Sequence, residues 1–407
     1  MKQGYLSQYF QGVVFKRLSS VEINPSSSNQ HEINGTIKLK EIFGSDRKDF
    51  SGYFFWIGSE NEGASANGSV TWYDARANHP TRSEFRLYYS DKEVVTSCDP
   101  GDLLVIAKRS DQEVLFLTAP EGSTTENQLL WLFDISSTSY SFSYQIFNKE
   151  KSTEMDFVSR FILEEMGIEI HEPETDKIDK ILEPYLYRKF PPTKKVAELA
   201  RETALTYSPV HNPDVTLMTW ADYEERLFRR LERYELSERL KEGFYDYQHD
   251  ESDVDGFISY SLRVQNRRKS RAGLSLEHHL AHIFEQNNIK FSQGQTTENK
   301  SKPDFLFPDI ETYQNTSQPE AKLTMLGAKS TCKDRWRQVL SEADRITNKH
   351  LLTLEPAISE HQTNEMINSK LQLVLPSALH ETYTEKQREW LMTLHEFIDM
   401  VKAKEIK

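Results

Sequence analysis

Short apolar runs separated by turn residues fill the chain up to about residue 135. Runs of this length, bounded by polar and glycine-containing segments, are typical of β-strands. The segment 109–112 lies between two of them and is a candidate hairpin loop. The pattern predicts a sheet-rich first domain, a closed or nearly closed β-barrel. The candidate strands are Gly12–Phe15, Tyr53–Trp56, Val70–Tyr73, Phe85–Tyr89, Leu103–Ile106 and Val114–Leu117.

From about Met155 the apolar positions recur at helical spacing. A charged segment with several prolines follows, and it predicts a linker over residues 171–195. Beyond it, Tyr223–Lys241 and Leu274–Phe284 have the charged and apolar faces of amphipathic helices. The sequence therefore predicts two domains, 1–170 and 196–407, and a multidomain α+β protein.

The second domain contains a strand, strand, helix pattern with charged residues at its junctions. Asp304 precedes the apolar run Phe305–Phe307, and Leu323–Thr331 is a candidate buried strand with Lys329 near its end. A helix is expected to follow, with Arg335 and Glu342 seven residues apart and hence on one face. The pattern predicts that Glu342 faces Lys329 and Asp304.

Two acids and a lysine in this arrangement can converge on one metal-bound phosphodiester. Hydrolysis requires an activated water and stabilisation of the charge that develops in the transition state, and a divalent metal can supply both. Asp304, Glu342 and the Ala328 carbonyl are candidate ligands for Mg²⁺, which prefers oxygen. Lys329 would orient or deprotonate the water. The alternative is an ordinary salt-bridged trio without catalytic function.

The net charge of −13 argues at first against a nucleic-acid partner, because phosphate binding depends on lysine and arginine. The basic residues are nevertheless clustered. One cluster follows Lys329, and the other supplies candidate phosphate contacts, although a basic run is often only a solvated face. These candidates are Arg267, Arg268, Lys269 and Arg271.

No apolar run approaches the ~18 residues needed to cross a bilayer, and the first residues lead into no signal-peptide core. We therefore expect a protein of the cytoplasm. The two cysteines, Cys98 and Cys332, are too few and too far apart for a disulfide framework or a zinc site. Both are expected to stay reduced.

Several motifs resemble the catalytic half of EcoRII-type restriction endonucleases of bacteria. The similarity extends over roughly residues 200 to 400, and it implies a PD-(D/E)XK nuclease core, a mixed sheet flanked by helices. In this resemblance the second acidic position is displaced to Glu342. The segments that carry it are 266–273, 302–308, 332–338, 342–344, 374–377 and 391–394.

The resemblance also implies roles for neighbouring residues. Residues after the catalytic lysine would contact the CC/GG arms of the target, since Lys and Arg donate to guanine and Asp accepts from cytosine. Glu277 matches a further acidic position that would hold a second metal or support the first, and Tyr313, which shares its spacing from Asp304 with the family, is a further candidate catalytic residue. Trp220 is a candidate platform for a base extruded from the duplex. The candidate base-reading residues are Lys333, Asp334 and Arg335.

The N-terminal half resembles the effector domain of the same family, a DNA-binding β-pseudobarrel. Arg82, Glu84 and Arg86 alternate, so on a strand they would project from one face and contact base edges. A polar outer face of a barrel explains the alternation equally well. His31, Lys16 and Arg17 would add base or phosphate contacts.

These features together predict a type II restriction endonuclease that binds two copies of its site in double-stranded DNA. One copy would bind the N-terminal domain and activate the enzyme, and the other copy would be cut. A homodimer is expected to cut it, since a palindromic target requires two-fold symmetry. The expected site is CCWGG, or else CCNGG, cut before the first C, with a cognate DNA methyltransferase as functional partner. The alternatives are a DNA-binding regulator with an inactive nuclease fold and a nicking or repair endonuclease.

Overall fold

The structure is a computed structural model of the chain, and it divides into two compact units. The first unit contains Met1–Ile170 and Pro356–Gln362, and the second contains His171–Glu355 and Thr363–Lys407. Within the part that is described, no helix is both long and apolar enough to span a bilayer. The described residues are 6–23, 32–57, 63–90, 97–147, 156–168, 176–186, 190–205, 207–246, 249–333 and 335–406.

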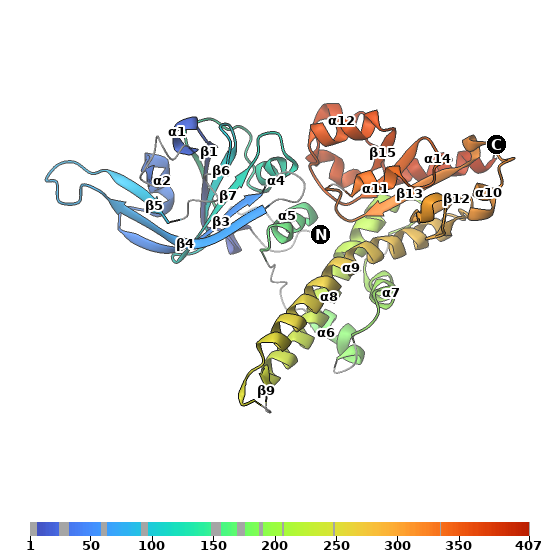
Figure 1. The fold of residues 1–407 in the computed structure, drawn as a ribbon, viewed down its shortest axis with the longest axis horizontal. Helices are drawn as coiled ribbons and strands as arrows, with labels where there is room; N and C mark the ends of the chain where they lie inside the picture. The colour runs from blue at the N-terminus through green and yellow to red at the C-terminus, as the bar shows by residue number, and fades with distance from the viewer. Residues whose placement is uncertain are drawn as a thin grey trace. The chain divides into compact units, whose positions relative to one another are not determined.

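An eight-stranded sheet is the centre of the first unit, and Figure 1 shows that it curls on itself. The strand order is β2-β5-β4-β3-β7-β6-β1-β8. Every neighbouring pair is antiparallel except β3 and β7. The strands are β1 (Gly12–Arg17), β2 (Glu32–Asn34), β3 (Lys48–Ile57), β4 (Gly63–Asp74), β5 (Phe85–Tyr89), β6 (Leu103–Lys108), β7 (Glu113–Ala119) and β8 (Ser143–Ile146).

Side chains at alternating strand positions form the core of the first unit. Phe54, Trp72, Leu87 and Phe116 are at most 1% exposed and belong to one apolar cluster. All six strands expected from the apolar runs are present, and β6 and β7 are joined by the expected hairpin loop. Among the described residues, the helices of this unit are η1 (Leu6–Gln8), α1 (Ser20–Ile23), α2 (Ile37–Phe43), α4 (Thr124–Leu132) and α5 (Phe157–Glu165).

Two long antiparallel helices, α8 (Pro213–Glu242) and α9 (Val254–Gln286), form a hairpin in the second unit, and they run side by side in Figure 1. Pro213 stands in the first turn of α8, where its missing N–H costs nothing. Gly243 ends the helix with φ 76°, a conformation that favours glycine. Asp253 caps α9 by accepting a 2.8 Å hydrogen bond from Gly256 N. Both helices are longer than the sequence predicted.

The expected linker, residues 171–195, is partly helical. It contains α6 (Asp176–Leu182), in which Ile178 and Leu182 are buried. The Arg230 guanidinium of α8 donates to both carboxylate oxygens of Asp179 at 2.7 and 2.8 Å, which ties α6 to the hairpin. The sequence did not predict this short helix, because its charged residues and the prolines around it are typical of a linker. It is followed by η2 (Glu183–Tyr185) and α7 (Thr193–Thr203).

A five-stranded mixed sheet, in the order β11-β12-β13-β14-β15, forms the core of the second unit. The first three strands are antiparallel to one another, and β13, β14 and β15 are parallel. The strands are β11 (Ser292–Gln293), β12 (Phe305–Phe307), β13 (Thr324–Lys329), β14 (Lys349–Thr353) and β15 (Leu371–Val374), and a small hairpin, β9 (Tyr245–Asp246) and β10 (Glu251–Ser252), joins α8 to α9.

An aromatic cluster anchors the helices on this sheet. Phe284 of α9 lies 5.3 Å from Phe305 and 5.2 Å from Phe307 between ring centroids, and Phe397 of α14 lies 5.7 Å from Phe307. The predicted α+β architecture, with a curled N-terminal sheet and a C-terminal mixed sheet flanked by helices, is therefore confirmed. The remaining helices are η3 (Glu298–Lys300), α10 (Ile310–Gln314), η4 (Glu320–Lys322), α11 (Trp336–Leu340), α12 (Glu360–Asn368), η5 (Ser377–Thr382), α13 (Glu385–Arg388) and α14 (Leu394–Ile406).

Candidate active site

Asp304 and Lys329 meet where β12 begins and β13 ends. The two strands are antiparallel, so the start of one lies beside the end of the other. Asp304 Oδ2 accepts hydrogen bonds from Lys329 Nζ and from Ala328 N, both at 2.7 Å. The Asp304 and Lys329 side chains are each 13% exposed. The carboxylate and the ammonium are thus fixed together at one edge of the sheet.

Glu342 lies within electrostatic reach of both residues. Burial raises the pKa of its carboxyl to about 7, the Lys329 charge lowers it, and the Asp304 charge raises it. The expectation that Glu342 lies on the helix with Arg335 was wrong, because α11 ends at Leu340 and the chain turns through Ala343 at φ 51°. Glu342 approaches the site from the turn after that helix.

Glu277 supplies a third carboxylate from α9. Burial raises its pKa, and the charge of Asp304 raises it further. Gln293 of β11 donates a 3.0 Å hydrogen bond to Glu277 Oε2 and so orients this carboxylate. Three carboxylates and one lysine therefore influence one another's charge. Glu277 comes from α9, Asp304 and Lys329 come from the adjacent ends of β12 and β13, and Glu342 comes from the turn after α11.

The donor set suits a hard divalent cation, which binds carboxylate oxygens. Glu342 Oε2 is buried, and among the described residues it has no hydrogen-bond partner. A buried carboxylate oxygen without a partner is costly unless a cation compensates it. The described residues contain no ready-made group of three or more metal-ligating side chains, so the carboxylates would have to close around an ion as it binds.

Tyr313 is held away from this chemistry by its own contacts. It is 2% exposed, and its hydroxyl donates to Glu298 Oε2 at 2.5 Å and accepts from Arg345 N at 3.3 Å. Burial, followed by the bond to Glu298, raises the pKa of the phenol. These contacts make Tyr313 a support for the turn that carries Glu342, and nothing in them gives it the catalytic role expected from the sequence.

The segment between β13 and α11 carries the candidate base-reading residues. Lys333, at φ 35°, and Arg335 are exposed, whereas Asp334 lies outside the described residues. The buried Glu355, 4% exposed, accepts a hydrogen bond from Cys332 N, and Thr353 Oγ1 donates to Ser330 O at 3.3 Å. Two side chains at the end of β14 thus hold the backbone that presents Lys333 and Arg335.

Glu355 and Gln293 were missed by the sequence reasoning. Glu355 follows β14, whose end lies beside that of β13 because the two strands are parallel, with Thr353 opposite Lys329. An acid just past a buried strand was the available signal. No pattern in the sequence pointed to Gln293, because β11 is only two residues long.

Trp220 is covered by protein. Its side chain on α8 is 6% exposed, and its ring centroid lies 5.7 Å from that of His279 and 5.6 Å from that of His282. The structure therefore gives it a packing role between the two long helices. The expected stacking of an extruded base on Trp220 would require this packing to open.

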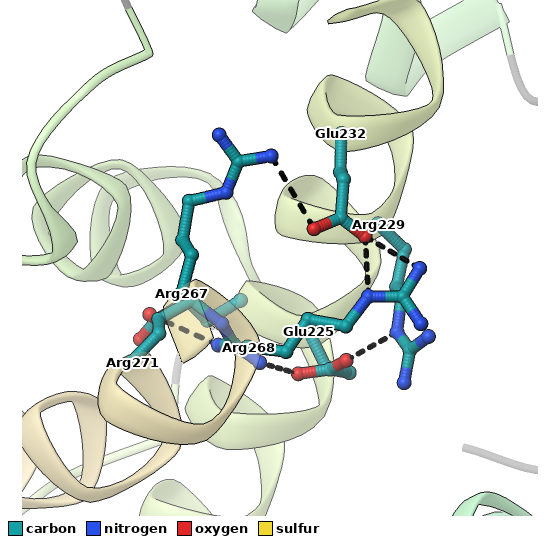
Figure 2. A network of polar contacts seen from close by, with 7 residues as sticks. Glu225, Arg229, Glu232, Arg267, Arg268 and Arg271 are labelled. Carbon is teal, nitrogen blue, oxygen red and sulfur yellow. Dashed lines mark hydrogen bonds and ion pairs between the residues drawn. The ribbon is translucent and has the colours of Figure 1, made fainter. Parts of the chain in front are cut away.

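The predicted phosphate-binding cluster forms ion pairs within the helical hairpin, as Figure 2 shows. Arg267 and Arg268 of α9 both contact Glu232 of α8, and Arg271 contacts Glu225. The guanidinium of Arg271 also lies 4.0 Å above the Phe228 ring. These three arginines are therefore structural in this conformation, which corrects the expectation that they face DNA. Nothing is described for the side chain of Lys269.

The candidate effector residues of the first unit are also largely paired. Arg86 contacts both Glu32 and Glu84, at 2.5 and 2.7 Å, and Arg82 is exposed before β5 begins. The expected alternation of three side chains along one strand is wrong, because only Arg86 belongs to β5. Lys16 pairs with Glu22 at 2.6 Å, Arg17 contacts Glu126, and His31 lies outside the described residues.

Comparisons with known proteins show what the second unit, with its mixed sheet and its group of carboxylates, is similar to. The protein family described as "EcoRII C terminal" matches residues 228–398. The type II restriction enzyme EcoRII of Escherichia coli is 44% identical over 188 residues, which are 46% of this chain and 45% of that enzyme. The chain thus matches about half the length of this relative. The predicted resemblance is confirmed for the matched region.

Solved structures of restriction endonucleases are also similar to part of the chain. Metal-depleted Ecl18kI in complex with uncleaved, modified DNA has a TM-score of 0.43 and 17% identity, over 56% of this chain and 82% of that one. A PspGI–substrate DNA complex has a TM-score of 0.42 and 13% identity, over 57% of this chain and 98% of that one.

Proposed function

We propose that this chain is a type II restriction endonuclease that makes double-strand cuts in DNA and depends on Mg²⁺. The observation that carries the proposal is the 2.7 Å pair of Asp304 and Lys329 at one edge of the mixed sheet, with the half-buried Glu342 carboxyl close enough for both charges to shift its pKa. The 44% identity to EcoRII in the matched region supports the same reaction class. A salt-bridged trio without function would not require a buried, unpartnered carboxylate oxygen on Glu342.

Each residue has a chemical task in this proposal. Asp304 and Glu342 would hold the ion, with the Ala328 carbonyl and Glu277 as further oxygen donors. A bound Mg²⁺ would supply Lewis-acid activation of water and of the scissile phosphate. Lys329, fixed by its 2.7 Å contact with Asp304, would orient the attacking water and stabilise the charge that develops on phosphate oxygens. Arg335 and Lys333 are placed on an exposed segment directly after Lys329, where they would contact base edges.

The finer parts of the proposal concern the target and its partners. The CC(W/N)GG site, the activation by a second DNA copy at the N-terminal unit, and the pairing with a cognate methyltransferase all rest on the resemblance to EcoRII. A homodimer follows from the symmetry of a palindromic target. Lys16, Arg17, Glu84 and Arg86 would have to exchange their present ion pairs for contacts with DNA.

Incubation of supercoiled plasmid with the protein and Mg²⁺ tests the proposal. We expect linear fragments whose sequenced ends share one short palindrome, with no cutting in the presence of a chelator. Persistent open circles would indicate a nicking enzyme. Intact plasmid that is nevertheless bound sequence-specifically would indicate a regulator with an inactive nuclease fold.

Arg335→Ala is expected to relax discrimination at one base pair of the site. The side chain is exposed at the start of α11, and a bidentate arginine–guanine contact contributes about 1–3 kcal/mol of discrimination. The measurement is the ratio of cleavage rates on the site and on single-substitution sites. An equal loss of cleavage rate on every sequence would indicate that Arg335 contacts the phosphate backbone and not a base.

Glu355→Ala is expected to lower the ratio of cleavage rates on the site and on single-substitution sites, without removing the proposed metal ligands. Its buried carboxylate holds Cys332 N, so its loss would free the segment that carries Lys333 and Arg335. Glu355→Gln, which retains an acceptor oxygen, should recover most of the discrimination. Equal cleavage ratios for wild type and Glu355→Ala would show that this bond does not position the reading residues.

A further inference from the structure

The turn that carries Glu342 has a strained backbone. Ala343, the next residue, is 1% exposed and has φ 51°, a region that residues other than glycine rarely adopt. Such a conformation persists only where neighbouring groups fix it. Within the turn, Ile346 N donates to Ala343 O at 2.9 Å. We call residues 342–346 the Glu342 turn. The direction of the Glu342 side chain depends on what holds this turn in place.

Lys349, the first residue of β14, supplies a buried cation to this turn. It is 7% exposed, and its Nζ donates to Ala343 O at 3.1 Å and to Ile346 O at 2.8 Å. Among the described residues, these two carbonyls are the only groups within hydrogen-bonding distance of the ammonium. A buried ammonium is costly unless hydrogen bonds replace its water. The ammonium and the Glu342 turn therefore stabilise each other.

The main chain of Lys349 is fixed by the mixed sheet. Lys349 N donates to Lys370 O at 3.0 Å, and Lys349 lies opposite Leu371 of β15 in the parallel ladder. On its other side β14 pairs with β13, the strand that carries Lys329. The Glu342 turn is therefore tied, through one side chain, to the sheet that positions the other residues of the site.

Lys349 also acts on Glu342 through its charge. Burial raises the pKa of the Glu342 carboxyl, and the positive charges of Lys329 and Lys349 lower it. Burial lowers the pKa of the Lys349 ammonium, whereas the charges of Asp344 and Glu342 raise it. Each group thus favours the charged form of the other, and the charged form of a carboxylate is the one that binds a metal ion.

We propose that Lys349 is a positioning residue for the metal ligand Glu342. Its ammonium holds the Glu342 turn on β14, so that the carboxylate stays close to Asp304 and Lys329 before an ion arrives. This inference rests on the proposed function, in which Glu342 holds Mg²⁺, and it adds the residue that keeps Glu342 in place. A ligand that is already in position loses less conformational freedom when the ion binds. If Lys349 served only the stability of the fold, its loss would lower the free energy of unfolding and leave the ion affinity unchanged.

Titration calorimetry of the full-length protein with Mn²⁺, in the presence of uncleavable site DNA, tests the proposal. Lys349→Met keeps the length of the side chain but removes its charge and its donors. We expect it to bind the ion about tenfold more weakly, the lower end of the effect of groups that support metal ligands. An affinity equal to that of the wild type would overturn the proposal.

Lys404→Met is the matched control. Lys404 is a half-buried lysine of the same unit, and its Nζ donates to Leu323 O at 3.2 Å and to Thr324 Oγ1 at 3.0 Å, where β13 begins. Lys329 stands at the other end of that strand, so Lys404→Met should leave the ion affinity within about twofold. An equal loss of affinity in Lys404→Met and Lys349→Met would overturn the proposal.

Combination with Glu342→Gln separates positioning from a direct effect of the lysine charge on the ion. If Lys349 acts through Glu342, Lys349→Met should weaken binding no further in a protein that already carries Glu342→Gln, because two substitutions in one interaction are not additive. A further loss as large as that caused by Lys349→Met alone would overturn the positioning role.

Hydrogen exchange of the metal-free protein gives a readout that needs neither the ion nor cleavage. The amides of the Glu342 turn should exchange slowly in the wild type and lose this protection in Lys349→Met, whereas those of β13 should exchange equally in both. Rapid exchange of the Glu342 turn in the wild type would overturn the proposal, even if Lys349→Met failed to fold. A wild type that shows the expected ion binding and exchange but leaves plasmid uncut would count against the nuclease alone.

Discussion

Lys329→Ala is expected to reduce DNA cleavage by at least about a thousandfold while site-specific binding remains. The loss follows because a preorganised cation at the reacting phosphate contributes on the order of 10²–10³ in rate, and Lys329 also fixes Asp304 through a 2.7 Å contact. Base contacts would come from the segment after Lys329, which this substitution leaves in place. The measurements are single-turnover cleavage with Mg²⁺ and binding to the site in its absence.

Lys322→Ala is the matched control for charge. Lys322 is exposed just before β13 begins, at the opposite end of the strand from Lys329. Its removal should leave the cleavage rate within about twofold, as expected of a surface residue without a partner in catalysis. Parallel loss of binding and cleavage in Lys329→Ala would contradict the separation of chemistry from recognition.

Glu224→Ala is expected to lower the free energy of unfolding by about 3–5 kcal/mol, because it leaves buried cationic and polar groups without their acceptor. Glu224 is fully buried, and Arg271, Ser275 and His279 all converge on it. Urea unfolding of the full chain, followed by the helical circular dichroism signal, measures the effect on the hairpin.

Glu235→Ala provides the comparison on the same pair of helices. Glu235 contacts Arg267 at 2.5 Å, but its side chain is 39% exposed. Solvent screens such a pair, so its loss should cost less than about 1 kcal/mol. If Glu224→Ala unfolded as easily as Glu235→Ala, the buried ion-pair seam would not be what holds the hairpin together.

The β-strands were predictable because their side chains alternate or form short buried runs with clear turn residues between them. Phe305–Phe307 and the six runs of the first unit fall within the observed strands. The start of α9 was missed because its first turns expose Val254, Phe257 and Ile258 to solvent. A helix with large apolar side chains on its solvent side lacks the polar outer surface that periodicity arguments assume.

The pairing of Asp304 with Lys329 was predictable because both residues stand at strand ends, which the antiparallel pairing of β12 with β13 brings together. The route of Glu342 was not, since it depends on the early end of α11 and the turn at Ala343. The ion pairs of Arg267, Arg268 and Arg271 were not predictable for a related reason. A run of arginines gives no sign that acids on another helix, here Glu225 and Glu232, already bind them.

The central claim is that the Asp304 and Glu342 carboxylates hold the catalytic ion. Titration calorimetry with uncleavable site DNA present tests it by measuring the binding of Mn²⁺ to the wild type and to Glu342→Gln. We expect the wild-type protein to bind at least one ion per active site and Glu342→Gln to bind it at least about tenfold more weakly, since a ligand oxygen has been replaced by a neutral amide. Unchanged affinity in Glu342→Gln, or no binding by the wild type, would contradict the account.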